Sequence, residues 1–150
     1  MTYEVQIGDR GKRHVPGGYP EDVAITGLGQ CVGVIIYDAE SKKSFSIHLT
    51  SPEGDEAEKL EEMLAEAAAE FETSESVVVA ATGACIVSDL SPAEELAKRL
   101  HVDQRLCTYF PRATMKIIWP SDGVESTSIT LDPQTGEFRF DHGSRDSGFR

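Results

Sequence analysis

The sequence predicts a single domain of the α+β class, because strand-like segments run along the whole chain and two segments have helical periodicity. At 150 residues the chain is long enough for one hydrophobic core and short for two. Hydrophobic residues make up 39% and charged residues 27%, which is typical of globular proteins. We therefore expect residues 1–140 to form one domain and residues 141–150 to be a polar, disordered tail.

The first third of the chain is predicted to hold four strands. Residues 3–7 alternate weakly, and the turn-rich segment 8–22 after them indicates a loop. Residues 23–26 form a short strand and residues 27–30 a tight turn. Residues 31–37 are apolar on both faces, as in a strand buried on both sides. The next strand alternates cleanly, with Phe45, Ile47 and Leu49 on one face and Ser44, Ser46 and His48 on the other.

Residues 55–72 are predicted to be an amphipathic helix. Acidic residues fill one side of this segment, which we expect to face solvent. The other side carries apolar residues at helical spacing: Leu60, Met63, Leu64, Ala67 and Phe71.

A second helix is expected to begin near Pro92. Residues 91–94 read SPAE, a capping box with proline at the first helical position. Leu96 and Leu100 are predicted to point inward, and the helix is expected to end or restart between residues 101 and 110. The remaining strands are predicted at residues 76–81, 115–119, 126–131 and 137–140, with a hairpin turn at 132–136.

The net charge of −12 argues against a nucleic-acid-binding protein and against binding to anionic membranes. One basic group, Arg10, Lys12, Arg13 and His14, is interpreted as a solvated loop, with a docking role as the less favoured alternative. No signal peptide or membrane-spanning segment is evident, which predicts a cytoplasmic protein.

The three cysteines, Cys31, Cys85 and Cys107, are widely spaced and odd in number, which favours reduced thiols over a disulfide framework. No zinc-type spacing of Cys or His is present, and we expect no metal and no other cofactor.

Cys31 and His48 are predicted to face each other across a hairpin. A four-residue connection at residues 38–41 would pair Tyr37 with Lys42 and Cys31 directly with His48. Directly opposed residues project to the same side of a sheet, with Cβ atoms about 4.5–5.5 Å apart. An odd loop length would place the two side chains on opposite faces.

Such a pair has the chemistry of a cysteine hydrolase. An imidazolium lowers the pKa of a neighbouring thiol, and the resulting thiolate is the nucleophile. His48 would then donate a proton to leaving ammonia and activate water, so that a carboxamide becomes a carboxylate. Backbone N–H groups around Gly29 and Gln30 could support the oxyanion.

The same residues allow two other interpretations. A dinucleotide-binding G-x-G-x-x-G motif is rejected, because Val32 occupies the third glycine position and a strand follows. The plainer interpretation is that Cys31 is inert packing and His48 a satisfied polar residue, and the two residues taken alone favour it.

Residues 25–38, ITGLGQCVGVIIYD, followed by His48 and Pro52, resemble the CheD family of chemoreceptor glutamine deamidases. That family carries a G-L-G-S-C-V-x-V-x-x-Y-D segment, with its catalytic His at this spacing on the next strand. The likeness extends to residues 7–9 (IGD), 82–84 (TGA), 115–118 (MKII), 128–131 (SITL) and 135–137 (TGE). Gln30 stands where the family has Ser, and Thr82 where it has Gly.

The resemblance implies a sandwich of mixed β-sheets flanked by helices in the order α/β/β/α, shared with the catalytic domain of cytotoxic necrotizing factor toxins. It also implies Cys31 as nucleophile and His48 as acid and base. The family's third catalytic residue, a Thr, corresponds to Thr26, or in the other register to the position of Ile25.

The leading hypothesis is therefore a deamidase of protein glutamine, with a chemoreceptor-like substrate in chemotaxis and a CheC-type phosphatase as possible partner. A binding module that kept the fold and docks on a signalling partner is the first alternative. A toxin-like deamidase of a host protein is the second.

Overall fold

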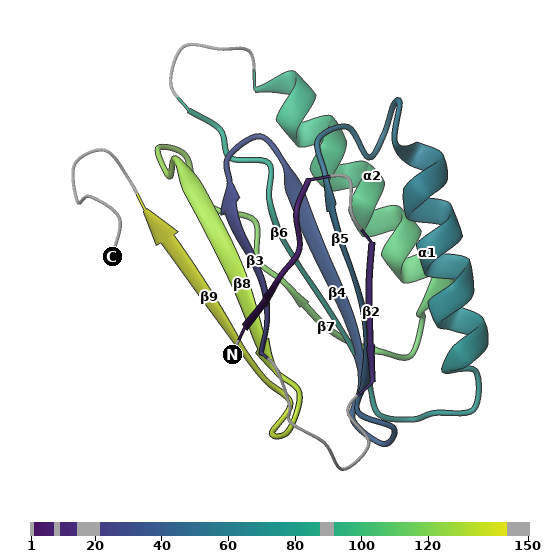
Figure 1. Ribbon diagram of the computed structural model, residues 1–150. Helices are drawn as coiled ribbons and strands as arrows, with labels where there is room; N and C mark the ends of the chain where they lie inside the picture. The colour runs from purple at the N-terminus through teal and green to yellow at the C-terminus, as the bar shows by residue number, and fades with distance from the viewer. Residues whose placement is uncertain (1, 8–9, 15–21, 88–91, 144–150) are drawn as a thin grey trace.

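The computed structural model describes residues 2–7, 10–14, 22–87 and 92–143. For residues 10–14 it describes the backbone. The described chain is of the α+β class, with two mixed β-sheets and two helices, as predicted (Figure 1).

A five-stranded sheet forms the middle of the molecule. Its strand order is β2-β5-β4-β6-β7, and all neighbours are antiparallel except β6 and β7, which are parallel. The strands are β2 (Arg10–His14), β4 (Val32–Asp38), β5 (Lys43–Leu49), β6 (Val77–Gly83) and β7 (Thr114–Ile117).

A four-stranded sheet packs on one face of the five-stranded sheet. Its order is β1-β3-β8-β9, with β1 parallel to β3 and the other neighbours antiparallel. The strands are β1 (Thr2–Glu4), β3 (Asp22–Leu28), β8 (Ser126–Asp132) and β9 (Glu137–Gly143).

Both helices, α1 (Ala57–Glu70) and α2 (Ala93–Tyr109), cover the other face of the five-stranded sheet (Figure 1). The layer order of the described residues is thus α/β/β, and the second outer helical layer of the expected α/β/β/α order is not among them. The outer face of the four-stranded sheet instead carries polar residues such as Thr26, which is exposed.

Two separate cores follow from the alternation of the central strand β4. Val32, Val34 and Ile36 pack with α1 and α2 in one hydrophobic cluster. Ile35 and Tyr37 point the other way and pack with residues of β3 and β8 between the sheets. The prediction that this strand is buried on both faces is confirmed, because every residue of β4 is buried.

The faces of β5 are also as predicted. Phe45, Ile47 and Leu49 pack in the cluster under the helices, so Ser44, Ser46 and His48 face the four-stranded sheet.

Strand β2 is absent from the prediction, which placed a loop over residues 8–22. The backbone of β2 pairs with β5 from Arg10–Ile47 to His14–Lys43. A basic, glycine-containing segment has no apolar alternation to reveal it, and here backbone hydrogen bonding to an existing sheet edge defines the strand.

Helix α2 runs unbroken to Tyr109, and its inward face differs from the prediction. Leu96 and Leu100 are 50% and 60% exposed, whereas Val102 and Leu106 are buried. The first two turns of α2 instead bury Glu95 and Lys98, a polar pair that a search for apolar periodicity overlooks. Ser91 of the expected capping box lies outside the described residues.

The prediction that residues 141–143 belong to a disordered tail is wrong. Strand β9 extends through residues 141–143, because Ser126, Thr127 and Ser128 of β8 provide backbone partners for them. Residues 144–150 of the expected tail lie outside the described residues. Neither helix combines the length and the apolar composition that a membrane span requires.

Candidate active site

Cys31 and His48 lie on the same side of the five-stranded sheet, facing the four-stranded sheet. His48 belongs to the inward-facing polar set of β5 and is 5% exposed. Cys31 immediately precedes β4 and packs, partly buried, against the cluster between the sheets. The prediction that the two side chains share one face is therefore confirmed.

The predicted direct pairing of Cys31 with His48 is wrong. β4 and β5 pair Val32 with Leu49 and Gly33 with His48, so the register places Cys31 opposite Thr50 and diagonal to His48. Diagonal neighbours lie farther apart than opposed ones, at about 7–8 Å. Among the described residues, no hydrogen bond joins the Cys31 thiol to the His48 ring.

The connection between the strands explains this difference. Asp38 remains in β4 and pairs with Lys43, so the four-residue turn is 39–42 instead of 38–41. The Asp38 carboxylate accepts hydrogen bonds from the N–H groups of Glu40 and Ser41, and Lys42 adopts φ 61. Each residue of β4 therefore pairs with a residue of β5 two positions later than predicted. A shift of two positions keeps the side chains of Cys31 and His48 on one face.

His48 is held by the segment that follows β1. Its Nδ1 lies 3.2 Å from the carbonyl oxygen of Val5, and since a carbonyl only accepts, Nδ1 is the donor. The other ring nitrogen, Nε2, is buried and has no hydrogen-bond partner among the described residues. In the neutral ring Nε2 is then the unprotonated, basic nitrogen.

The backbone around Cys31 is fixed by the two residues that follow β6 and by α2. The carbonyl of Gly29 accepts from the N–H of Cys85 at 2.8 Å, and that of Cys31 accepts from Ala84 at 2.9 Å. Between them, the carbonyl of Gln30 accepts from Lys98 Nζ at 3.0 Å. Among the described residues, the N–H groups of Gln30 and Cys31 have no acceptor.

Gly83 permits the close approach of β6 to Cys31. An added Cβ at Gly83, where φ is +117, would lie 2.1 Å from the Cys31 carbonyl oxygen. Gly33 has a similar role between the sheets, since a Cβ there would lie 2.9 Å from Leu28 Cδ1. Gly83 thus lets β6 approach Cys31, and Gly33 lets the side chains of β3 pack against β4.

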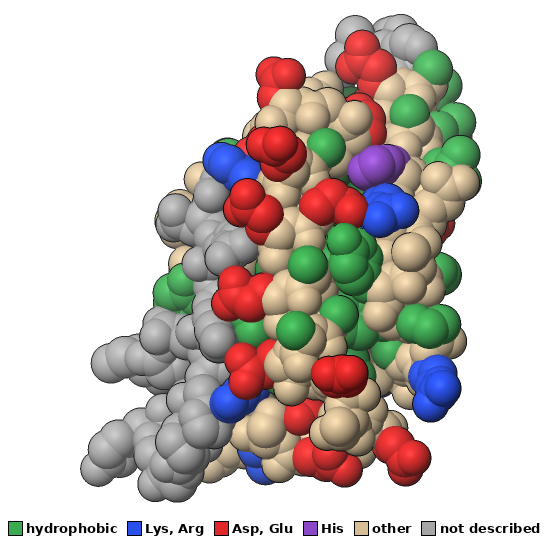
Figure 2. Space-filling view, turned by 90° about the vertical axis from the view of Figure 1, so that its right-hand side faces the viewer, with side chains coloured by type: hydrophobic (Ala, Val, Ile, Leu, Met, Phe, Trp, Pro, Cys, Tyr) green, Lys and Arg blue, Asp and Glu red, His purple; other side chains and the backbone are tan. Residues whose placement is uncertain are grey.

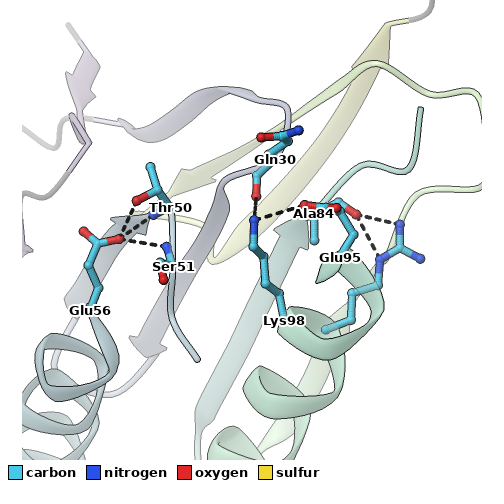
Figure 3. A network of polar contacts seen from close by, with 8 residues as sticks. Gln30, Thr50, Ser51, Glu56, Ala84, Glu95 and Lys98 are labelled. Carbon is cyan, nitrogen blue, oxygen red and sulfur yellow. Dashed lines mark hydrogen bonds and ion pairs between the residues drawn. The ribbon is translucent and has the colours of Figure 1, made fainter. Parts of the chain in front are cut away.

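Lys98 and Glu56 act on Cys31 with opposite charges. Figure 3 shows Lys98 against Gln30 and Glu56 against Thr50 and Ser51. Glu56, at the amino-terminal end of α1, accepts from the N–H groups of Thr50 and Ser51 and from the Thr50 hydroxyl. Burial raises the pKa of the Cys31 thiol; Lys98 acts to lower it and Glu56 to raise it. Burial is the largest of these effects, so the pKa of the Cys31 thiol lies above its ordinary value.

The structure does not bring Thr26 to Cys31 and His48. Thr26 is exposed, and its N–H and hydroxyl both donate to the Glu4 carboxylate at 3.1 Å. Of Ile25 and Thr26, Ile25 is the one that points between the sheets, where its side chain lies against Gly33. The expected turn at 27–30 begins as a bulge in β3, with Gly27 at φ 65.

Two of the cavities away from the Cys31–His48 pair lie at the two ends of β4 and β6. The larger, about 550 Å³, is lined by Phe71, Val77, Phe110 and neighbouring residues at the opposite end of β4 and β6. The other, about 290 Å³, lies at the near end and is lined by Thr82, Trp119, His142 and neighbouring residues. Among the described residues, no group of three His, Cys, Asp or Glu side chains is placed to hold a metal ion.

Arg99 completes the contacts that α2 makes with this end of the sheet. Its guanidinium donates to the carbonyls of Ala84 and Pro120 and lies 5.9 Å from the Trp119 ring centre.

Sequence reasoning missed Glu56, Lys98 and Arg99. The one available signal was the pairing of Glu95 with Lys98 at i,i+3 on a segment where apolar residues were expected to face inward.

The other cysteines are free thiols, as predicted. Cys85 is buried beside the same loop and donates to the carbonyl of Leu28, and burial raises the pKa of its thiol to about 11. Cys107 is exposed on α2. Cys31 is thus the cysteine that combines partial exposure with a histidine on the same face.

Comparison with known proteins adds no assignment. No protein-family model matches the chain, and no curated protein matches it in sequence.

Proposed function

We propose that this protein is a cysteine amidohydrolase that converts glutamine side chains of a protein substrate to glutamate, with Cys31 as nucleophile and His48 as acid and base. One observation carries the proposal. Val5 holds His48 Nδ1, and the buried Nε2, which has no partner within the described ranges, lies on the same face as the Cys31 thiol. This tautomer is the one a general base requires.

In the proposed reaction, Nε2 of His48 takes the thiol proton and the Cys31 sulfur attacks the carboxamide carbon. The imidazolium then protonates the leaving nitrogen, the C–N bond breaks, and ammonia departs from a thioester. Water, deprotonated by His48, attacks the thioester, and Cys31 leaves as the thiol. The sum is carboxamide plus water giving carboxylic acid plus ammonia.

The backbone supports the oxyanion of both tetrahedral intermediates. The N–H groups of Gln30 and Cys31, which have no acceptor in the described part of the chain, are the candidate donors, and the bonded carbonyls of Gly29 and Cys31 hold this segment in place. Thr26 stays a weaker candidate for the third catalytic residue, because its hydroxyl is bound to Glu4 on the outer face of the four-stranded sheet.

The substrate class rests on the resemblance of residues 25–38 and His48 to the CheD family. It favours chemoreceptor glutamines as substrates, a CheD-like fold, action in the cytoplasm and a CheC-type phosphatase as partner. No cofactor takes part in the proposed steps.

The test is incubation of the protein with a chemoreceptor cytoplasmic domain, followed by measurement of ammonia and of mass at each glutamine. We expect a gain of one mass unit at specific glutamines, which the Cys31→Ser and His48→Gln variants lose. Cys107→Ser is the matched control, since Cys107 is exposed and away from the pair. Equal product from wild type and Cys31→Ser would overturn the proposal.

A second candidate, a binding module with this fold, is favoured by the raised pKa of the Cys31 thiol and by the missing thiol–imidazole hydrogen bond. The pH dependence of iodoacetamide reaction separates the two. A hydrolase thiolate reacts well below pH 8 when His48 is intact, whereas the thiol of a binding module reacts only above it.

A further inference from the structure

Lys98 is an unusual lysine, because it is 8% exposed and its Nζ is bound on two sides. It lies 3.0 Å from the Gln30 carbonyl oxygen and 3.0 Å from Glu95 Oε1 (Figure 3). Burying an ammonium is costly unless it is paired and hydrogen-bonded, and both conditions are met here. A surface lysine would supply no such fixed contact.

The carbonyl that Lys98 binds belongs to the peptide group between Gln30 and Cys31. A peptide group is planar and trans, so its C=O and N–H point in opposite directions. Holding the Gln30 oxygen toward α2 therefore aims the Cys31 N–H away from α2. The positive charge also polarises this peptide group and makes its N–H a stronger donor.

We propose that Lys98 is a positioning residue for Cys31: it fixes the Gln30–Cys31 peptide so that its N–H can serve the oxyanion, and it favours the thiolate over the thiol. This inference rests on the proposed function of Cys31. It assigns a role to a side chain of α2 that touches neither the thiol nor a substrate.

The charged and titratable groups around Cys31 come from three elements. Lys98 and its partner Glu95 lie on α2, Glu56 at the start of α1, and His48 on β5. Lys98 stabilises the thiolate and Glu56 destabilises it. Because the two act in opposite directions, substituting each gives effects of opposite sign.

The experiment measures the rate of Cys31 alkylation by iodoacetamide against pH, in full-length protein carrying Cys107→Ser. Lys98→Met should slow the reaction at neutral pH by roughly three- to tenfold and move the pH profile upward. Lys98→Arg, which keeps the charge, should restore most of the rate. Glu56→Gln should speed the reaction and move the profile downward.

Lys43→Met is the matched control for removing a lysine. Lys43 lies at the far end of β5, opposite Asp38, and binds Glu70 at 2.9 Å. The pH profile of Cys31 alkylation in the Lys43→Met variant should coincide with that of the parent protein. Thermal unfolding of each variant shows that it is folded at the assay temperature.

A folded Lys98→Met or Lys98→Gln variant with an unchanged profile would overturn the inference, as would equal shifts from Lys43→Met. This outcome differs from failure of the proposed function. If receptor deamidation is absent while Lys98→Met still shifts the alkylation profile, the deamidase assignment fails and the effect of Lys98 on the Cys31 thiolate stands.

Discussion

Gly83 shows how a single residue determines the geometry of the candidate site. Its backbone has φ +117, and the Cys31 carbonyl oxygen occupies the space where a Cβ would stand. A glycine here serves both conformation and close packing. The sequence marked Gly83 only as part of a three-residue likeness to CheD proteins, and its contact with Cys31 became visible only in the structure.

We expect Gly83→Ala to destabilise the protein by about 2–4 kcal/mol, because backbone strain and a steric clash add. Gly123→Ala is the matched control: φ is +92 there, but nothing lies within 4 Å of the added Cβ. It should cost only about 1 kcal/mol of strain. Urea unfolding of both variants gives the comparison, and equal losses would contradict the clash.

The β4–β5 hairpin shows what one turn decides at the scale of an element. Predicted and observed turns both have four residues, but Asp38 keeps its place in β4 and its carboxylate binds the turn. Apolar alternation fixed which residues face inward. It left the pairing open by two residues, because a shift of two preserves every face.

The Asp38 carboxylate should make hairpin stability depend on pH. Burial acts to raise the pKa of Asp38, but hydrogen bonds from Ser41, Ser74 and Glu40 outweigh it and hold the pKa below its ordinary value. The ionised Asp38 carboxylate therefore contributes fully to the free energy of unfolding above its ordinary pKa, near pH 4. This contribution is lost as pH falls through the lower pKa of the folded state.

We expect Asp38→Asn to cost about 1–2 kcal/mol at neutral pH and progressively less toward pH 2, where the wild-type carboxyl is protonated as well. Urea unfolding across this pH range is the measurement. Glu53→Gln, at an exposed position, should show little difference from wild type at any pH. A loss in the free energy of unfolding that is the same for Asp38→Asn at every pH would contradict this prediction.

At the scale of the whole molecule, the three layers divide the surface into faces of different character. The helical layer presents acidic side chains to solvent, many of them from α1 (Figure 2). Glu58, Glu62, Glu66 and Glu70 follow each other at intervals of four residues and are all exposed. Like charges at this spacing repel one another, and the chain carries a net charge of −12.

Salt should therefore stabilise the protein. Raising sodium chloride from about 0.1 M to about 1 M shortens the screening length from about 10 Å to about 3 Å and weakens this repulsion. We expect the free energy of unfolding to rise with salt. It should rise less in the Glu58→Lys variant, where the interaction of position 58 with Glu62 becomes attractive instead of repulsive. Urea unfolding at each salt concentration tests this, and a wild-type stability that falls with salt would refute it.

The sequence by itself determined the class of the fold, the position of both helices, the strands with apolar alternation and the shared face of Cys31 and His48. Each depends on local periodicity, which adjacent residues express directly. The sequence did not reveal β2, the inward face of α2 or the last residues of β9. Backbone pairing defines the two strand segments and burial of polar residues defines the helix face, and both depend on partners that are distant in the sequence.

Only the tertiary structure decided the register of the hairpin, the bond from His48 to Val5 and the approach of Lys98 to the Gln30 carbonyl. Each joins residues that the chain brings together only after the sheets and helices have packed. Ile25 and Thr26 make the same point, since the direction of a side chain at a bulge depends on the neighbouring strand. Local pattern predicted the shared face of Cys31 and His48, a family resemblance singled them out as candidates, and packing supplied their surroundings.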